Sequence, residues 1–192
     1  MAGRTAHPPR ELPGDRGRLR RRAPASTWRA GQSVSVRITV DSSTLSQPGA
    51  YQGELIARTD SPYGTAAPID VVLQATPPKT WGKVTGTVLD GSGAPIAGAT
   101  VAICTMYDTR TGACGPTTYT LKTDGHGGYQ LWLDQGFNPL QIIAAENGYT
   151  PIMKIARIHK GESTTVDFTL AASGTFTQAK VQAYLRANLH AR

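Results

Sequence analysis

Apolar and polar residues alternate with a period of two in short runs along the predicted domain of residues 82–171, and turns rich in Gly, Pro and Asp separate these runs. This spacing is typical of a small antiparallel β-sandwich. It predicts seven strands, near residues 82–89, 99–105, 117–123, 128–133, 139–146, 150–159 and 163–170. The expected core consists of the apolar residues that share the inward phase of these runs: Val84, Val88, Ile96, Val101, Ile103, Tyr129, Leu131, Leu133, Leu140, Ile142, Tyr149, Ile155, Ile158, Val166, Phe168 and Leu170.

A second β segment precedes this sandwich, over residues 31–76. Its alternation predicts strands at 33–40, 51–58 and 69–75, and the first of these places Val34, Val36, Ile38 and Val40 on one face. Three strands are few for an independent sandwich, so we expect this segment to be part of a domain. Residues 77–81 begin with two prolines, which hold the backbone extended, and therefore predict a short stiff linker.

The pattern changes to a helical period at the carboxyl end, within residues 175–191. Thr177 can cap a helix, and Val181, Tyr184, Leu185 and Leu189 then recur at helical spacing. A helix this short depends on packing for its stability. We expect it to dock on its own sandwich, and a partner-binding face is the alternative.

Charge is concentrated at the amino terminus of the 192-residue chain. Residues 1–30 hold eight arginines and two acidic residues, net +6, which leaves only +1 of the total +7 for the remainder. This tail has too few aliphatic residues to offset its ordering entropy, so we expect it to be disordered. A nucleic-acid arm is the alternative, but no aromatic residue is interleaved with the arginines for base stacking, so no specific nucleic-acid partner is expected.

Neither a membrane span nor a secretory leader is predicted within this sequence. It contains no window of about 18 apolar residues, and its basic amino terminus lacks the apolar stretch of a signal peptide. On these grounds alone we expect no membrane partner, and the chain as encoded is expected in the cytoplasm.

Several motifs make residues 82–170 similar to the carboxypeptidase regulatory-like domain, a prealbumin-type sandwich. The matching pieces are residues 86–88, 95–101, 123–129, 148–149 and 167–170, in the order and spacing of that family. The resemblance implies a module without catalytic function, because this domain is the non-catalytic part of the enzymes after which it is named. The related starch-binding-like sandwiches share the architecture, which makes a carbohydrate-binding module the alternative function.

Residues 31–80 resemble the end of an immunoglobulin-like domain of secreted actinobacterial subtilisin-like proteases. The matching pieces are residues 30–34, 45–51 and 77–82, and in such proteases this domain directly precedes a regulatory-like domain. The resemblance implies a partial immunoglobulin-like domain, an extracellular location, and a chain that is the accessory carboxyl-terminal remnant of such a protease. The protease domain and the first immunoglobulin-like strands are not present in this sequence.

The search for reactive groups predicts no catalytic, metal-binding or cofactor-binding residue. Single Ser, His and Asp residues occur, but none lies in a recognisable catalytic context. The histidines His7, His126, His159 and His190 lack the spacing of zinc ligands. Residues 124–127 offer one carboxylate, whereas calcium requires six to eight oxygen ligands, so we interpret them as a hairpin turn. We therefore expect no enzyme activity, and an active peptidase is the least favoured reading.

Cys104 and Cys114 are the only cysteines, ten residues apart across an expected loop. This separation suits a disulfide in an exported protein. Two free thiols are the alternative if the protein stays in the cytosol.

Three aromatic residues are the candidate ligand contacts: Trp132, Tyr107 and Tyr119. Trp132 interrupts the alternation of Leu131 and Leu133, so it should point away from the core. Trp81 is expected to fill the joint between the two β segments. The expected partner is a protein or a cell-wall or other polysaccharide surface, and the sequence leaves the oligomeric state open.

Overall fold

The computed structural model describes residues 35, 37–39, 45–57 and 67–189. The chain divides into two compact units, and the change from one to the other falls between Thr76 and Pro77. The basic tail over residues 1–30 lies outside the described residues, so the prediction made for it stays a prediction.

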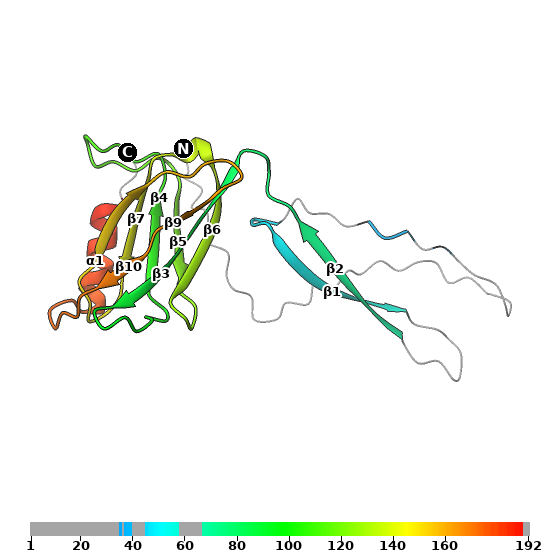
Figure 1. Ribbon diagram of the computed structural model, residues 1–192, viewed down its shortest axis with the longest axis horizontal. Helices are drawn as coiled ribbons and strands as arrows, with labels where there is room; N and C mark the ends of the chain where they lie inside the picture. Colours follow the sequence, from blue (N-terminus) through cyan, green and yellow to red (C-terminus); the bar gives the residue numbers. More distant parts are fainter. Residues whose placement is uncertain (1–34, 36, 40–44, 58–66, 190–192) are drawn as a thin grey trace. The chain divides into compact units, whose positions relative to one another are not determined.

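Two four-stranded sheets form the unit that begins at Pro77 (Figure 1). One sheet contains β3 (Trp81–Asp90), β6 (Gly128–Asp134), β9 (Ser163–Thr165) and β10 (Phe168–Leu170). The other has the order β5 (Thr118–Lys122), β4 (Thr100–Cys104), β7 (Leu140–Ala145) and β8 (Ile152–Ala156). A short 3-10 helix, η1 (Gln135–Phe137), joins β6 to β7. The predicted all-β sandwich is confirmed.

The last predicted strand differs from expectation in its pairing. Residues 163–170 form two short strands, and both pair with β3 in parallel, with Ser163 opposite Lys83 and Phe168 opposite Val88. The chain leaves the ladder between them, where the Asp167 carboxylate accepts from the Thr87 backbone N–H at 2.7 Å and from its hydroxyl at 2.9 Å. The sandwich is therefore antiparallel except along one side of β3.

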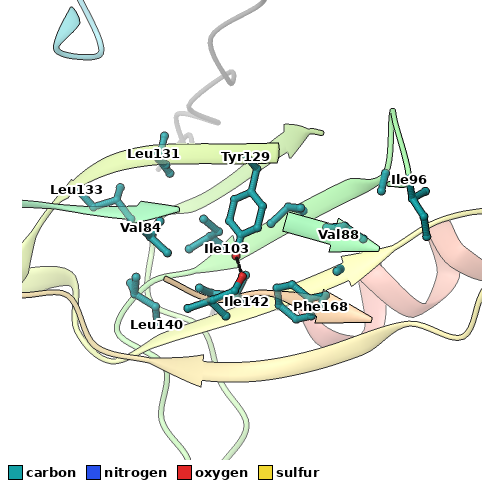
Figure 2. Close-up of a cluster of buried hydrophobic side chains, with 14 of the residues drawn as sticks. Val84, Val88, Ile96, Ile103, Tyr129, Leu131, Leu133, Leu140, Ile142 and Phe168 are labelled. Carbon is teal, nitrogen blue, oxygen red and sulfur yellow. Dashed lines mark hydrogen bonds between the residues drawn. The ribbon is translucent and has the colours of Figure 1, made fainter. Parts of the chain in front are cut away.

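The core lies between the two sheets. Tyr129 points into it from β6, its ring 6.4 Å from that of Phe168, and its hydroxyl donates to the Val166 carbonyl at 2.5 Å (Figure 2). Every predicted core residue is buried except Tyr149, which is half-buried against the core, and Ile155. The prediction for Ile155 is wrong: it is 50% exposed because it lies on the edge strand β8, opposite Gln141 and on the outer face of its sheet.

Helix α1 (Gln178–Asn188) covers the outer face of the sheet that contains β4 and β7. Val181 and Leu185 pack there against Ala102, Ile143 and Ala145, and all five are buried. In Figure 1 the helix lies on the side of the sandwich away from β6. The expected docking of the helix on its own sandwich is confirmed, and it creates a second apolar cluster that the sequence analysis did not name.

The unit that ends at Thr76 contains, in its described part, one antiparallel hairpin of β1 (Gly49–Ala57) and β2 (Ala67–Ala75). Its register runs from Gly49 opposite Ala75 to Ala57 opposite Ala67. These strands correspond to two of the three that were predicted. The third was expected at 33–40, where the described residues 35 and 37–39 are not in a strand and the rest lie outside the described part.

Candidate functional site

A disulfide closes the loop that follows β4. Cys104 and Cys114 are bonded, with their Cα atoms 5.4 Å apart, and both are buried. The predicted disulfide is therefore present. The Cys114 sulfur lies 3.7 Å from the Asn188 carbonyl oxygen, at the end of α1, so the bond holds the loop beneath the helix terminus.

The tip of this loop is a compact turn built around Asp108. Its carboxylate accepts from the Arg110 backbone N–H at 2.9 Å and from the Thr111 hydroxyl at 2.8 Å. Its backbone N–H donates to the Ala113 carbonyl at 2.9 Å. Tyr107, a predicted contact residue, is half-buried, and its backbone N–H donates to the Pro139 carbonyl at 2.9 Å. The loop thus presents Tyr107 on a backbone that is fixed at both ends.

Tyr119 takes part in core packing. It lies on β5 and packs, partly buried, against the main hydrophobic cluster. Desolvation by this burial raises the pKa of its phenol above the ordinary tyrosine value. Tyr119 and Trp132 belong to different sheets, so these two predicted contact residues do not lie on one face of a sheet.

Trp132 lies on the outer face of β6. It is half-buried between the fully buried Leu131 and Leu133, which fits the predicted direction away from the core. Its register partner is Lys83 on β3, and the next pair on the same face is Trp81 with Asp134. Diagonal neighbours on one sheet face are about 7–8 Å apart, so the two indoles are close enough for one ligand to touch both.

Polar groups surround these indoles on the same face. Thr85 pairs with Gln130 one step further along, and Gln130 is exposed. Asp134 is used within the fold: it accepts from the Thr80 hydroxyl at 2.5 Å and the Gly136 N–H at 2.8 Å. These two bonds hold the pKa of its carboxyl below the ordinary value. The face combines flat apolar rings with hydrogen-bonding groups.

The acidic turn at residues 124–128 joins β5 to β6, and because these two strands belong to different sheets it does not close a hairpin. The Asp124 carboxylate accepts from the backbone N–H groups of Gly128 and His126, each at 2.8 Å, and these bonds hold its pKa below the ordinary value. Residues 124–127 therefore form a turn as predicted, but the expected hairpin is wrong, because β5 pairs with β4 and β6 pairs with β3. Across residues 35, 37–39, 45–57 and 67–189, no group of three or more His, Cys, Asp or Glu side chains could hold a metal ion.

Sequence reasoning missed a groove of about 510 Å³ between α1 and β5. It brings two cations, Lys122 and Arg186, to one surface from positions 64 residues apart in the chain. Its other lining residues are Thr100, Thr120, Gln182, Leu185 and Leu189. No local motif connects a strand lysine to a helix arginine, so only the docking of α1 reveals the groove.

Solved structures with a similar arrangement of strands include three proteins of distant sequence. The streptococcal ancillary pilin is 15% identical, with a TM-score of 0.40 over 65% of this chain and 45% of that chain. The minor pilin GBS52 of Streptococcus agalactiae is 16% identical, with a TM-score of 0.39 over 67% and 62%. The 3-chlorocatechol 1,2-dioxygenase of Rhodococcus opacus 1CP is 16% identical, with a TM-score of 0.37 over 48% and 59%.

The class defined by the fold is an all-β sandwich module with a docked carboxyl-terminal helix. Residues 83–171 match the family model of the carboxypeptidase regulatory-like domain, which supports the presence of that domain in this part of the chain. A protein glycotransferase of Haloferax volcanii, dolichyl-monophosphooligosaccharide–protein glycotransferase AglB, is 30% identical over 110 residues. That similarity covers 57% of this chain and 10% of the relative, so the chain spans about a tenth of the relative's length.

None of the helices in the described part is both long enough and apolar enough to cross a bilayer.

Proposed function

We propose that this chain is a non-catalytic β-sandwich module that binds another protein, and that it is the accessory carboxyl-terminal part of a secreted subtilisin-like protease. The observation that carries the proposal is the regulatory-like domain match over residues 83–171 on a sandwich with one continuous core. A sandwich of this kind supplies a rigid scaffold, and its loops and edges supply the contacts.

The disulfide suits the secreted location. Disulfides persist in oxidising compartments and are rare in the cytosol. The Cys104–Cys114 bond closes a loop at one end of the sandwich and fixes it against α1, so a partner would meet a preorganised surface.

Carbohydrate binding is the second candidate, and the register of β3 and β6 favours it. Trp81 and Trp132 share the outer face of this sheet, and Lys83 and Gln130 lie beside them. Flat aromatic faces take the apolar faces of sugar rings, and neighbouring amide and ammonium groups bind hydroxyls.

The protease connection is tested with the coding DNA upstream of this chain. We expect a subtilisin-like catalytic domain with its Asp, His and Ser, either in frame or separated by a frameshift. The catalytic domain, produced separately, should bind the immobilised full chain by surface plasmon resonance. Absence of such a coding region, or absence of binding, contradicts the proposed partnership.

Function class is tested with the purified full chain. It should not hydrolyse fluorogenic peptide substrates, and it should not sediment with insoluble starch, chitin or cell-wall polysaccharide. Sedimentation that is lost in Trp132→Ala and retained in Trp132→Phe favours carbohydrate binding instead. Peptide hydrolysis by the chain contradicts the non-catalytic role.

A further inference from the structure

Strand β5 has an open edge. It is the terminal strand of its sheet and, among the described residues, it pairs only with β4. The phase of its hydrogen bonds is set on both sides: Thr117 accepts from the Thr105 N–H at 3.3 Å, and the Thr123 N–H donates to Ala99 at 3.0 Å. Backbone groups alternate in direction along an antiparallel strand. Thr118, Thr120 and Lys122 therefore direct their N–H and C=O groups away from β4.

The groove between α1 and β5 runs beside this open edge. Leu185 and Leu189 give it an apolar side, and Thr120 and Gln182 add uncharged polar groups. Lys122 and Arg186 bring two positive charges, and no acidic residue is among the groove's lining residues. The side chains of the open strand and of the helix thus form one amphipathic, cationic surface.

Lys122 does not block the edge. Lysines on edge strands often prevent pairing with another strand. Here the ammonium donates to the Thr100 hydroxyl at 2.8 Å and to the Gly98 carbonyl at 2.9 Å. Thr100 is the register partner of Lys122 on β4, so the side chain folds back over its own sheet. Both acceptors are uncharged, and an ammonium has three N–H donors, which leaves one for a ligand carboxylate.

Arg186 also stabilises the end of its own helix, but this role does not account for the second cation, Lys122, on the facing strand. It lies in the last turn of α1, where a positive charge interacts favourably with the helix dipole. That interaction requires nothing of β5. The presence of Lys122 on the facing strand is the independent feature, and the two charges together favour an anionic occupant.

We propose that an extended acidic segment of a partner protein adds to the edge of β5 and occupies this groove. Its backbone pairs with Thr118, Thr120 and Lys122, a carboxylate contacts Lys122 and Arg186, and an apolar side chain packs on the two leucines. Side chains that point to one face of a strand are two residues apart, about 7 Å. The recognised segment therefore carries an acidic and an apolar residue two positions apart. This mode of recognition is strand addition, and it rests on the proposed protein-binding function.

The experiment measures fluorescence anisotropy of labelled hexapeptides, rich in Thr and Val, with the full-length chain. One peptide contains Glu two positions from Leu, and its control contains Gln in place of Glu. We expect the Glu peptide to bind about two- to fivefold more tightly than the control, because Lys122 and Arg186 are exposed and an ion pair with an exposed partner is partly screened by solvent. Lys122→Gln and Arg186→Gln should each weaken the Glu peptide, whereas the matched change Lys160→Gln, outside the groove, should not.

Hydrogen exchange supplies a readout that charge alone would not change. Bound peptide should slow exchange at the amides of Thr118, Thr120 and Lys122 and leave those of Tyr119 and Leu121, already paired with β4, unaltered. Thermal unfolding of each variant checks that folding is intact. If Lys122→Gln is unstable, the Arg186→Gln variant, at an exposed position, provides the test of the charge contact.

Four outcomes overturn the inference: equal affinity for the Glu and Gln peptides, no protection at the β5 edge, dimerisation of the chain through β5 in sedimentation velocity, or binding of polygalacturonate without binding of peptide. If the chain binds the protease catalytic domain but none of these peptides, this inference fails and the proposed function stands. If the peptides bind and the catalytic domain does not, the proposed protease partnership fails alone.

Discussion

Gly86 should be among the least replaceable residues of the sandwich. It lies in β3 in the inward phase, and a Cβ at this position would overlap the carbonyl group of Val166 and lie 3.0 Å from Cε1 of Tyr129. Val166 is fixed there by two hydrogen bonds: its N–H donates to Thr85 at 2.8 Å, and its carbonyl accepts from Tyr129 at 2.5 Å. The added Cβ would meet backbone rather than a flexible side chain, so Gly86→Ala must displace the backbone at Val166, between β9 and β10.

These contacts determine how much stability Gly86→Ala should lose. Overpacking of a core position costs about 1–3 kcal/mol. Loss of the Tyr129–Val166 bond adds about 1 kcal/mol. The sum of about 3 kcal/mol corresponds to a fall in Tm of about 12–24 °C, at about 4–8 °C per kcal/mol for a domain of this size.

The assay is urea denaturation of the full chain followed by tryptophan fluorescence, together with a thermal scan by circular dichroism. Gly91→Ala is the matched control, because a Cβ at Gly91 would meet nothing within 4 Å. That control should leave stability unchanged or raise it by about 0.4–1 kcal/mol, through the reduced entropy of the unfolded chain. A free energy of unfolding for Gly86→Ala within about 0.5 kcal/mol of the Gly91→Ala value would refute the steric reasoning, since additivity errors are of that size.

Three further predictions concern Tyr129 and the disulfide. Tyr129→Phe keeps the ring but leaves the Val166 carbonyl without its donor, so urea denaturation at pH 7 should show a loss of about 1–2 kcal/mol, more than for Tyr119→Phe. Burial and the nearby charge of Asp167 raise the pKa of the Tyr129 phenol above its ordinary value. The stability of the wild type should therefore fall as pH rises above that ordinary value, near 10, and the fall between pH 9 and 11 should be smaller in Tyr129→Phe. An equal dependence of stability on pH in the two proteins contradicts this cause. The double variant Cys104→Ala/Cys114→Ala should lose about 3 kcal/mol, as expected for a short closed loop, and dithiothreitol should not destabilise it further; a urea midpoint equal to that of the wild type would show that the disulfide does not stabilise the fold.

Period-two alternation predicted most of the main core because β3 and β6 each expose one face to the core and one away from it. The phase of Val84 and Val88, or of Leu131 and Leu133, is a local property that a strand carries in its sequence. Ile155 was misplaced because apolar residues occur in both phases of the edge strand β8, while Lys154 occupies an inward position opposite Ile142. Ile152 packs on the core, whereas Ile155 is exposed. Local alternation does not report strand order, so it does not identify an edge.

The sequences of β4 and β7 contain a signal for the second apolar cluster. All five residues of β4 and all six of β7 are buried, and a strand buried on both faces shows a nearly continuous apolar run. Such a run indicates that something covers the outer face, and the carboxyl-terminal helix is the amphipathic element available. The parallel pairing of β9 and β10 with β3 has no comparable signal, because it joins segments about 80 residues apart.

The candidate contacts were predicted one by one, and the structure distributes them over different surfaces. Trp132 lies on the outer face of β6, Tyr119 packs on the core from β5, and Tyr107 lies in the disulfide loop. A shared surface can be identified only when the strand order is known. The groove of Lys122 and Arg186 could not be predicted from the sequence for the same reason.

Helix α1 links stability to the proposed binding surface. Its docking seals Ala102 and Ile143, and the same docking leaves β5 uncovered beside the helix, which creates the groove. Leu185 serves both purposes, because it is buried in the cluster and also lines the groove. Substitution of Leu185 would therefore change folding and binding together, whereas Gln182 is exposed on the groove side and reports on binding alone. A ligand that contacts both α1 and β5 would in turn stabilise the docked helix, since binding to the folded form alone shifts the unfolding equilibrium towards it.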